Sequence, residues 1–586
     1  MQTRRTFLNS TLLLAGTAVA EGRNGIALAA AEGGIDPGML SAKLTLPDGS
    51  VKTFAGARGV DLGDFVVPFA RIVQRNVLTK DASGLFSVFF RPDRNSNRLE
   101  VVTLYGDPQN DSPHTHGPYT FEIFVGERSV QKTEVPYHFW LARWRWQSSP
   151  RPRVRKPSEL IAAKLSPPYG ITEIAATKLP NPAKPYTVMG ISSITPFIGQ
   201  TGERGDIGIN PECHSAYMAT EDATAYQSMM DWAEASGTGP WHINDPATGG
   251  VFSFAANPDA TIISNGTKPL HVQRASERDA SGKFIYPTFI QPDDAHHPCT
   301  SYIPFITTGD PYHAEELQYQ INFYLGGESQ PKGRPKSFIF DQAQTRGYAW
   351  MMRSVLFNIL AADLIQSPTL LPKGYWKRIL DNNLAWITAN FVDAKDNKEF
   401  WFSSGTSKTA MGWWQENYLC GVIATAVQLG FREWLPVLKW KIQTDINRLN
   451  GKSGWNPGWP TLYFAQYVKQ SQRPGEHNAG NGALQFDRLS ERGSQYSYVG
   501  EWQIRFKSST EFDIVAPSGA PPAGSVRAGI VGKRTGSGYV PMFTVNAGSE
   551  PFAAGDVIYW TISKITNWKD LWDTNLAMGV VKDAGP

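Results

Sequence analysis

The stretch "SYIPFITTGDPYHAEEL" (301–317) decides the fold class of the middle of this chain, because it reads as two helices joined by a tight turn. Gly309 suits the left-handed position that ends a helix, Asp310 suits the N-cap of the next helix, and Pro311 suits its first turn. The turn therefore accounts for Asp310 without a catalytic role. A short join between two helices favours an antiparallel helical hairpin.

Helical periodicity continues on both sides of this hairpin, from about residue 205 to 470. Several segments repeat apolar residues at helical spacing. These segments are 216–235, 345–366, 375–392, 413–430 and 432–449. The joins between them are short, and the pair Tyr217 and Tyr226 flanks an acidic turn much as Tyr302 and Tyr312 do. A repeated hairpin indicates a solenoid or a closed ring.

The flanks of the helical region have a strand pattern instead. Short runs rich in Val, Phe, Tyr and Trp, separated by turn residues, are typical of antiparallel sheets. These runs are 84–92, 98–106, 119–127 and 137–147 on one side, and 498–506, 511–517, 538–546 and 556–565 on the other. The sequence thus predicts a multidomain α+β chain. We expect a β-sandwich at 40–165, a helical-hairpin domain at 200–485 and a small β domain at 490–586.

This order of domains resembles the α/α-toroid superfamily of glycan-cleaving enzymes, which includes six-hairpin glycosidases and toroidal polysaccharide lyases. The resemblance covers roughly residues 200–480 and lies in the architecture and in the aromatic and acidic composition of the loops. It implies that the hairpins close into a toroid. It also implies a pocket at one mouth of the ring, built from the loops that enter the inner helices, with a polysaccharide or oligosaccharide as substrate.

The first 31 residues have the pattern of an export signal. Arg4 and Arg5 precede a short apolar stretch at 11–20, and small residues near 29–31 suit cleavage. This pattern is typical of a twin-arginine signal peptide. We therefore expect the twin-arginine export machinery as a partner and a periplasmic or secreted mature protein. No later apolar run approaches the length of about eighteen residues that a membrane span needs, so none is expected.

Composition excludes some classes of function. The chain has 586 residues, a formal net charge of +3 and 19% charged residues, which argues against nucleic acid as the main partner. The 19 Trp, 21 Tyr and 30 Phe residues suit a large core or the stacking of sugar rings. The serine-nucleophile motif GxSxG and the phosphate loop are missing from the sequence, and no cofactor is expected. Three cysteines without a CxxC pair favour free thiols.

Two loops before or after helices carry candidate functional residues in the first half of the helical region. Glu203, Arg204 and Asp206 precede a helix expected to start at Pro211, with Asp206 as a possible acid or base. Trp241, His242 and Asp245 follow a helix that ends near 237, and they are candidates for a sugar subsite. The alternatives are an end cap for the first group and ordinary loop packing for the second.

Two further stretches carry the remaining candidates. The stretch "DDAHH" enters the helix at 302 and carries four polar candidates, Asp293, Asp294, His296 and His297. The structural alternative for the two aspartates is that a helix N-terminus favours negative charge. The stretch "GWWQENYL" places two tryptophans beside an acid, Trp413, Trp414 and Glu416. Arg346 and Tyr348 open another helix, where the arginine could hold a substrate carboxylate. A metal site is the rival interpretation of the histidines, but they lack an HExxH motif or an i,i+4 pair, so we expect no metal.

Three functions remain open. In a hydrolase, two carboxylates among Asp206, Asp294 and Glu416 would act as acid and base or nucleophile. In a polysaccharide lyase, a base (His296, His297 or Tyr302) would remove the proton beside a uronate carboxylate that Arg346 neutralises. The third possibility is a glycan-binding or envelope structural protein without catalysis. Carboxylates outnumber basic residues in the four loops, so hydrolysis is favoured over elimination.

Overall fold

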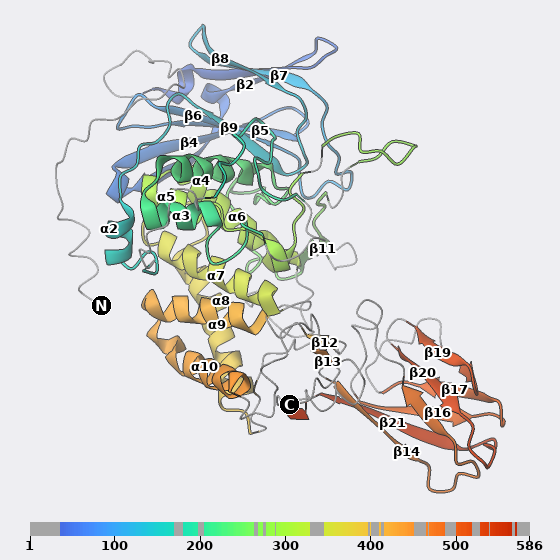
Figure 1. Ribbon diagram of the computed structural model, residues 1–586. Coiled ribbons are helices and arrows are strands. Elements are labelled where there is room, and N and C mark those ends of the chain that lie inside the picture. Colours follow the sequence, from blue (N-terminus) through green and yellow to red (C-terminus); the bar gives the residue numbers. More distant parts are fainter. Residues whose placement is uncertain are drawn as a thin grey trace. The chain divides into compact units, whose positions relative to one another are not determined.

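Figure 1 shows the computed structural model, which describes most of the chain after residue 34. The described residues are 35–168, 180–196, 204–262, 268–273, 277–287, 289–327, 345–395, 399, 410–411, 415–450, 465–466, 468–486, 500–517, 528–537, 540–564 and 569–570. The export signal expected at 1–31 lies outside them. The chain divides into two compact units: unit 1 is Met1–Phe340 with Trp350–Asn382, and unit 2 is Asp341–Ala349 with Asn383–Pro586.

Unit 1 begins with two antiparallel sheets. The first sheet has the order β2 (Val51–Ala55), β1 (Leu40–Thr45), β7 (Tyr119–Val125), β8 (Arg128–Val135). The second has the order β3 (Val60–Val67), β4 (Ile72–Lys80), β5 (Phe86–Pro92), β6 (Leu99–Tyr105), β9 (Ala142–Gln147). Phe121 of the first sheet meets Trp144 of the second edge to face at 5.4 Å, and the Trp144 indole donates to the Tyr119 hydroxyl at 3.1 Å. The two sheets therefore pack face to face.

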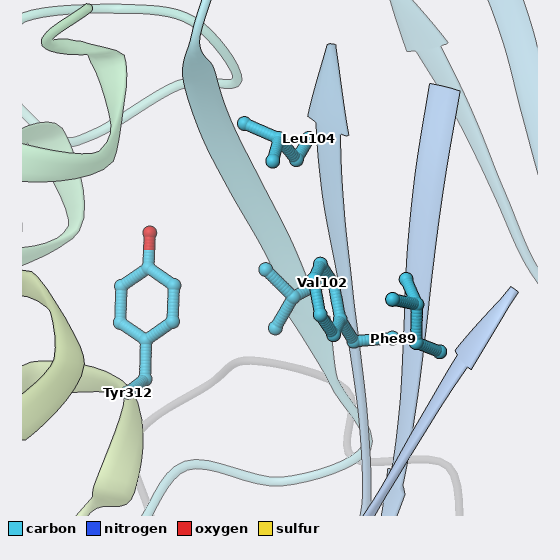
Figure 2. Packing of buried hydrophobic residues seen from close by; sticks show 5 residues of the cluster. Phe89, Val102, Leu104 and Tyr312 are labelled. Carbon is cyan, nitrogen blue, oxygen red and sulfur yellow. The ribbon is translucent and has the colours of Figure 1, made fainter. Parts of the chain in front are cut away.

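The five-stranded sheet is covered on its other face as well. Every residue of β5 and β6 is buried, as expected for strands enclosed on both sides. On the second face, Tyr312 of helix α6 (Pro311–Gly327) packs on Phe89, Val102 and Leu104 (Figure 2). Figure 1 shows the helices of unit 1 layered below this sheet. A polar side chain on the helix-facing side of β5, β6 or β9 therefore needs a partner within the protein.

The described helices that lie wholly in unit 1 are α2 (Pro157–Ala162), α3 (Glu212–Thr220), α4 (Ala223–Ala235), α5 (Tyr302–Thr308) and α6. Among them α3 pairs with α4, and α5 with α6, as hairpins. At the joint of α5 and α6, Gly309 has φ 72° and its N–H donates to the Phe305 carbonyl at 2.7 Å. Asp310 accepts from the Tyr312 N–H at 3.2 Å. The predictions that Gly309 ends one helix and that Asp310 caps the next are both confirmed. The helix expected at Pro211 begins at Glu212, with Pro211 as its N-cap.

Helices α7 (Thr345–Ala361) and α8 (Lys373–Ile387) contribute residues to both units. Unit 2 contains α9 (Gln415–Gln428), α10 (Leu435–Leu449) and two antiparallel sheets. One sheet has the order β14 (Val468–Pro474), β21 (Val557–Lys564), β16 (Gly500–Phe506), β17 (Glu511–Val515), β18 (Ala528–Ile530). The other has the order β15 (Ala483–Phe486), β20 (Val540–Asn546), β19 (Arg534–Ser537). Trp560 of the first contacts Phe543 of the second at 5.2 Å. Two short pairs complete the strands: β10 (Ala260–Thr261) with β11 (Lys268–Pro269), and β12 (Ala410–Met411) with β13 (Ala465–Gln466).

The prediction of a multidomain α+β chain is confirmed, with antiparallel sheets in the N-terminal region and helices in the middle. The sequence placed the last β domain at 490–586, but β14 and β15 precede 490 and belong to the same sheets. The run at 468–474 is polar and lacks apolar alternation, which is why its strand was not recognised. Its Gln472 side chain both donates to and accepts from the Leu484 backbone, at 2.9 and 2.6 Å. The closed toroid stays a prediction.

Candidate functional site

Unit 1 has a hollow of about 190 Å³ beside the first turn of α3. Two irregular stretches at 180–195 and 205–206 meet the start of α3 and the middle of α4 there. The lining residues are Pro180, Asn181, Pro182, Ala183, Ser193, Thr195, Gly205, Asp206, Glu212, Cys213, Ser228 and Trp232. The hollow thus combines two carboxylates, three hydroxyl groups and one indole.

Asp206 is a fixed carboxylate in this hollow. It is 2% exposed, and its two oxygens accept from different donors. Arg204 Nε donates to Oδ1 at 2.9 Å, and the Thr195 N–H donates to Oδ2 at 3.1 Å. A carboxylate has about four lone-pair positions, so Asp206 can still accept from a ligand while these bonds hold its orientation.

Glu212 is the second carboxylate, and it is exposed. Its backbone N–H donates to the Gly205 carbonyl at 2.7 Å, which brings the start of α3 against the 204–206 stretch. A Cβ atom on Gly205 would overlap the Glu212 carboxyl group, so a larger residue here would displace that side chain. Within the described residues, the Glu212 carboxylate has no hydrogen bond or ion pair, and it is available to a ligand.

Hydrogen-bond donors also line the hollow. The Ser193 hydroxyl accepts from the Lys184 N–H and the Ser228 hydroxyl from the Ala183 N–H, both at 2.9 Å. Because each oxygen already accepts, each hydroxyl hydrogen can be donated to a ligand. Trp232 is 5% exposed, and its Nε1 has no acceptor among the described residues. These groups suit a ligand that carries several hydroxyls.

Cys213 lines the hollow but is unsuited to nucleophilic attack. Burial raises the pKa of its thiol to about 12, so the thiolate is scarce at neutral pH. Cys213, Cys299 and Cys420 are all free, as the sequence predicted.

Arg204 connects the hollow to the stretch "DDAHH". Besides Asp206, it donates through Nη2 to the His296 carbonyl at 3.2 Å. His296 Nδ1 lies 2.9 Å from Asp293 Oδ1, and its Nε2 has no partner among the described residues. A carboxylate that orients one imidazole nitrogen and leaves the other without a partner is the arrangement of a general base. The structure thus brings Arg204, Asp206, Asp293 and His296 together, as a cluster that includes part of the hollow.

The other candidates of this stretch have structural contacts. The His297 ring stacks on Tyr324 at 4.4 Å, and its carbonyl accepts from Arg353 Nη2 at 3.1 Å. Asp294 lies in a short 3₁₀ turn, and its side chain lies outside what the structure describes. Tyr302 is fully buried, and its hydroxyl donates to the Leu165 carbonyl at 2.6 Å. Burial raises its pKa well above the ordinary value, so the proton stays on the hydroxyl.

The second loop lies in a different, closed environment. His242 is fully buried, with Nε2 at 2.9 Å from both carboxylate oxygens of Glu316 and Nδ1 at 2.7 Å from the Leu141 carbonyl. Trp241 is 1% exposed. Asp245 closes a turn by accepting from the Ala247 N–H at 2.8 Å. None of these three lines the hollow.

His242 belongs to a buried ionic network between the five-stranded sheet and the helices. Arg91 donates both terminal nitrogens to Glu315, at 2.6 and 2.9 Å, and Arg143 Nη2 donates to Glu315 at 2.9 Å. Arg145 has three acidic partners: Glu100 at 2.6 Å, Glu234 at 2.5 Å and Asp310 at 2.8 Å. Asp310 is therefore both a helix cap and an ion-pair partner. We call the set Arg91, Glu100, Arg143, Arg145, Glu234, His242, Asp310, Glu315 and Glu316 the buried network.

The remaining described candidates lie in unit 2. Glu416 and Lys441 are fully buried and form an ion pair at 2.6 Å. The Arg346 N–H donates to the Gln415 side chain at 3.1 Å, and the Tyr348 hydroxyl donates to Asn383 at 3.0 Å. Glu203, Trp413 and Trp414 lie outside the described residues.

Sequence reasoning missed Glu212, Trp232, Ser193 and Ser228. Glu212 lies inside the stretch 202–217 that was considered, but it reads as an ordinary first-turn acid. Ser228 and Trp232 lie four residues apart on α4, a signal of a shared helix face that could have been used. Within the described ranges, no three His, Cys, Asp or Glu side chains are arranged to hold a metal ion. The helices described are all too short or too polar to cross a bilayer.

Comparisons with known proteins give no family. No family model and no curated protein matches the sequence. The crystal structure of Xanthomonas campestris FlgL aligns with 20% of this chain at 18% identity and a TM-score of 0.13. The alignment spans 36% of the FlgL chain. A partial likeness of this kind carries no argument, so the function has to be argued from the site alone.

Proposed function

We propose that this protein is an exported enzyme that hydrolyses glycosidic bonds of a polysaccharide or oligosaccharide at the hollow of unit 1. One observation carries the proposal: Asp206 and Glu212 line the same hollow, together with Trp232 and several hydroxyl groups. Glycoside hydrolysis needs two carboxylates at one site. Hydroxyl and carboxylate groups match sugar hydroxyls.

The two carboxylates suit different roles. Asp206 is held by Arg204 and the Thr195 N–H, so it is the better candidate for the oriented base or nucleophile. Glu212 is exposed and has no described partner, so its carboxyl group is free to approach a bound sugar as the second group of the pair. Asp294 and Glu416 stay predictions from the sequence, because the Asp294 side chain is not described and Glu416 is buried against Lys441 in unit 2. The toroid and the twin-arginine export route remain part of the proposal.

A second candidate is elimination by a polysaccharide lyase, which the Asp293–His296 pair favours. An imidazole with one oriented nitrogen can remove a proton beside a uronate carboxylate. In this alternative His296 is the base.

The two candidates are separated by incubating the purified mature protein with neutral and uronic-acid polysaccharides. Reducing ends and the ultraviolet absorbance of unsaturated uronates are followed together. Hydrolysis gives reducing ends alone, and we expect Asp206→Asn and Glu212→Gln each to lower its rate by about 10²–10⁴-fold. Elimination gives both signals, and in that case His296→Gln is the variant that should lower the rate.

The control variant is Glu221→Gln, which changes an exposed acid at the other end of α3. It should leave either rate unchanged. Glycan binding without any product on a broad panel would contradict both enzymatic proposals and leave the non-catalytic glycan-binding function.

A further inference from the structure

We infer that the sugar bound in the hollow carries a free amine, so that the substrate is a glucosamine-type glycan and not a uronate. This inference rests on the proposed function of the same hollow and names its substrate class.

The first step is the charge of the lining. Asp206 and Glu212 both line the hollow, whereas the described lining residues include no lysine, arginine or histidine. Arg204 contacts Asp206 from outside the lining, and it also donates to the His296 carbonyl. Arg204 compensates the charge of Asp206, so the excess negative charge of the lining is that of Glu212. This charge repels an anionic sugar and attracts an ammonium group.

The second step is the position of Glu212. An acid in the first turn of a helix is explained by the helix dipole alone, so its sequence position indicates no ligand. However, its exposed carboxylate has no partner among the described residues, and it lies over Gly205, where any other side chain would displace it. A carboxylate without a partner forms a charge-assisted hydrogen bond with an ammonium, which is about twice as strong as a neutral hydrogen bond.

The third step is independent of the carboxylates. Trp232 is 95% buried beside the hollow, and its indole N–H has no acceptor in the described part of the chain. A buried donor without an acceptor is costly, so a ligand oxygen that accepts from it is favoured. The donatable hydroxyls of Ser193 and Ser228 add to this preference. The hollow thus offers donors for sugar oxygens as well as acceptors for an amine.

The test compares the binding of three short oligosaccharides of equal length by calorimetry at low salt. They are a glucosamine oligomer, its N-acetylated counterpart and a galacturonate oligomer. We expect the glucosamine oligomer to bind about tenfold more tightly than the N-acetylated one, equivalent to ~1.4 kcal/mol, and the galacturonate to bind most weakly. Added salt should reduce the preference.

Glu212→Gln should abolish the preference for the amine, whereas Glu221→Gln should retain it. Equal or tighter binding of galacturonate would overturn the inference, as would a preference that survives Glu212→Gln. So would failure of all three oligomers to bind, or equally tight binding of a simple amine such as ethanolamine.

Product analysis on the same samples separates this inference from the proposed function. Amine-selective binding without cleavage refutes the proposed hydrolytic activity and leaves the inference on the substrate class standing. Cleavage of neutral glycans without amine selectivity refutes only the substrate class.

Discussion

Glu315→Gln should destabilise unit 1 strongly, because Glu315 compensates two buried arginines at once. Arg91 and Arg143 are 0% and 1% exposed at their side chains, and both donate to this carboxylate. Removing one partner of a buried ion pair costs about 3–5 kcal/mol. Arg91 retains Glu100 at 3.5 Å and Arg143 retains Glu316 at 3.4 Å, so the lower end of this range, about 3 kcal/mol, is expected.

This loss converts into a measurable melting shift. Unfolding entropy is ~2.1 cal/mol/K per residue, which gives ~0.7 kcal/mol/K for the roughly 340 residues of unit 1 after the export signal. A loss of about 3 kcal/mol therefore lowers the melting temperature by about 4 °C. Circular dichroism on heating and tryptophan fluorescence in denaturant would measure it.

Two further variants sharpen the test. Lys377→Ala breaks the exposed pair of Lys377 and Asp381 and should cost at most about 0.5 kcal/mol. The triple variant Arg91→Met, Arg143→Met, Glu315→Leu removes all three charges together and should recover much of the stability. A loss for Glu315→Gln no larger than that of Lys377→Ala would refute the reasoning.

Three other outcomes are expected. Gly205→Ala should lower glycan turnover or binding about tenfold by displacing the Glu212 carboxylate, with little loss of stability because the displaced group is the end of a flexible side chain. Gly374→Ala is the neutral control, since an added Cβ there meets nothing within 4 Å. Unchanged turnover and binding in Gly205→Ala would count against the site. Burial alone would raise the pKa of Glu316, but His242 and Arg143 lower it to about 2 from its ordinary 4.5. The stability that Glu316 contributes should therefore be complete above about pH 4.5 and decrease toward pH 2. Denaturant titrations at a series of pH values should show that Glu316→Gln lacks this decrease in the free energy of unfolding. Iodoacetamide at pH 8 should leave Cys213 unmodified in the native protein and label it in denaturant, and rapid native labelling seen by mass spectrometry would disprove a protonated thiol.

Local sequence rules predicted local structure well. Gly309 and Asp310 form the helix joint that their residue types indicate, because a cap depends on neighbours within a few residues. The same holds for β5, β6, β7 and β9, whose aromatic and β-branched runs are continuous in the sequence.

The candidate site could be predicted only in part. Arg204 and Asp206 are two residues apart, and their pairing follows from proximity. The contact between Arg204 and His296 spans 92 residues, and that between Arg91 and Glu315 spans 224. Such contacts depend on tertiary packing, which no local pattern encodes. His242 illustrates the consequence, because a loop histidine beside a tryptophan suggests a sugar subsite, yet Glu316 on a distant helix encloses it.

The spacing of the buried network also bears on how the protein is synthesised. The sheet that carries Arg91 and Arg143 leaves the ribosome well before α6, which supplies Glu315. At roughly 5–20 residues per second, the 224 residues between Arg91 and Glu315 take about ten to fifty seconds to translate. During this interval the nascent sheet has Arg91 and Arg143 on one face without Glu315, and Glu100 is the acidic partner that the sheet itself supplies. A fragment that ends near residue 165 lacks α6, so it leaves Phe89, Val102 and Leu104 without the cover that Tyr312 provides.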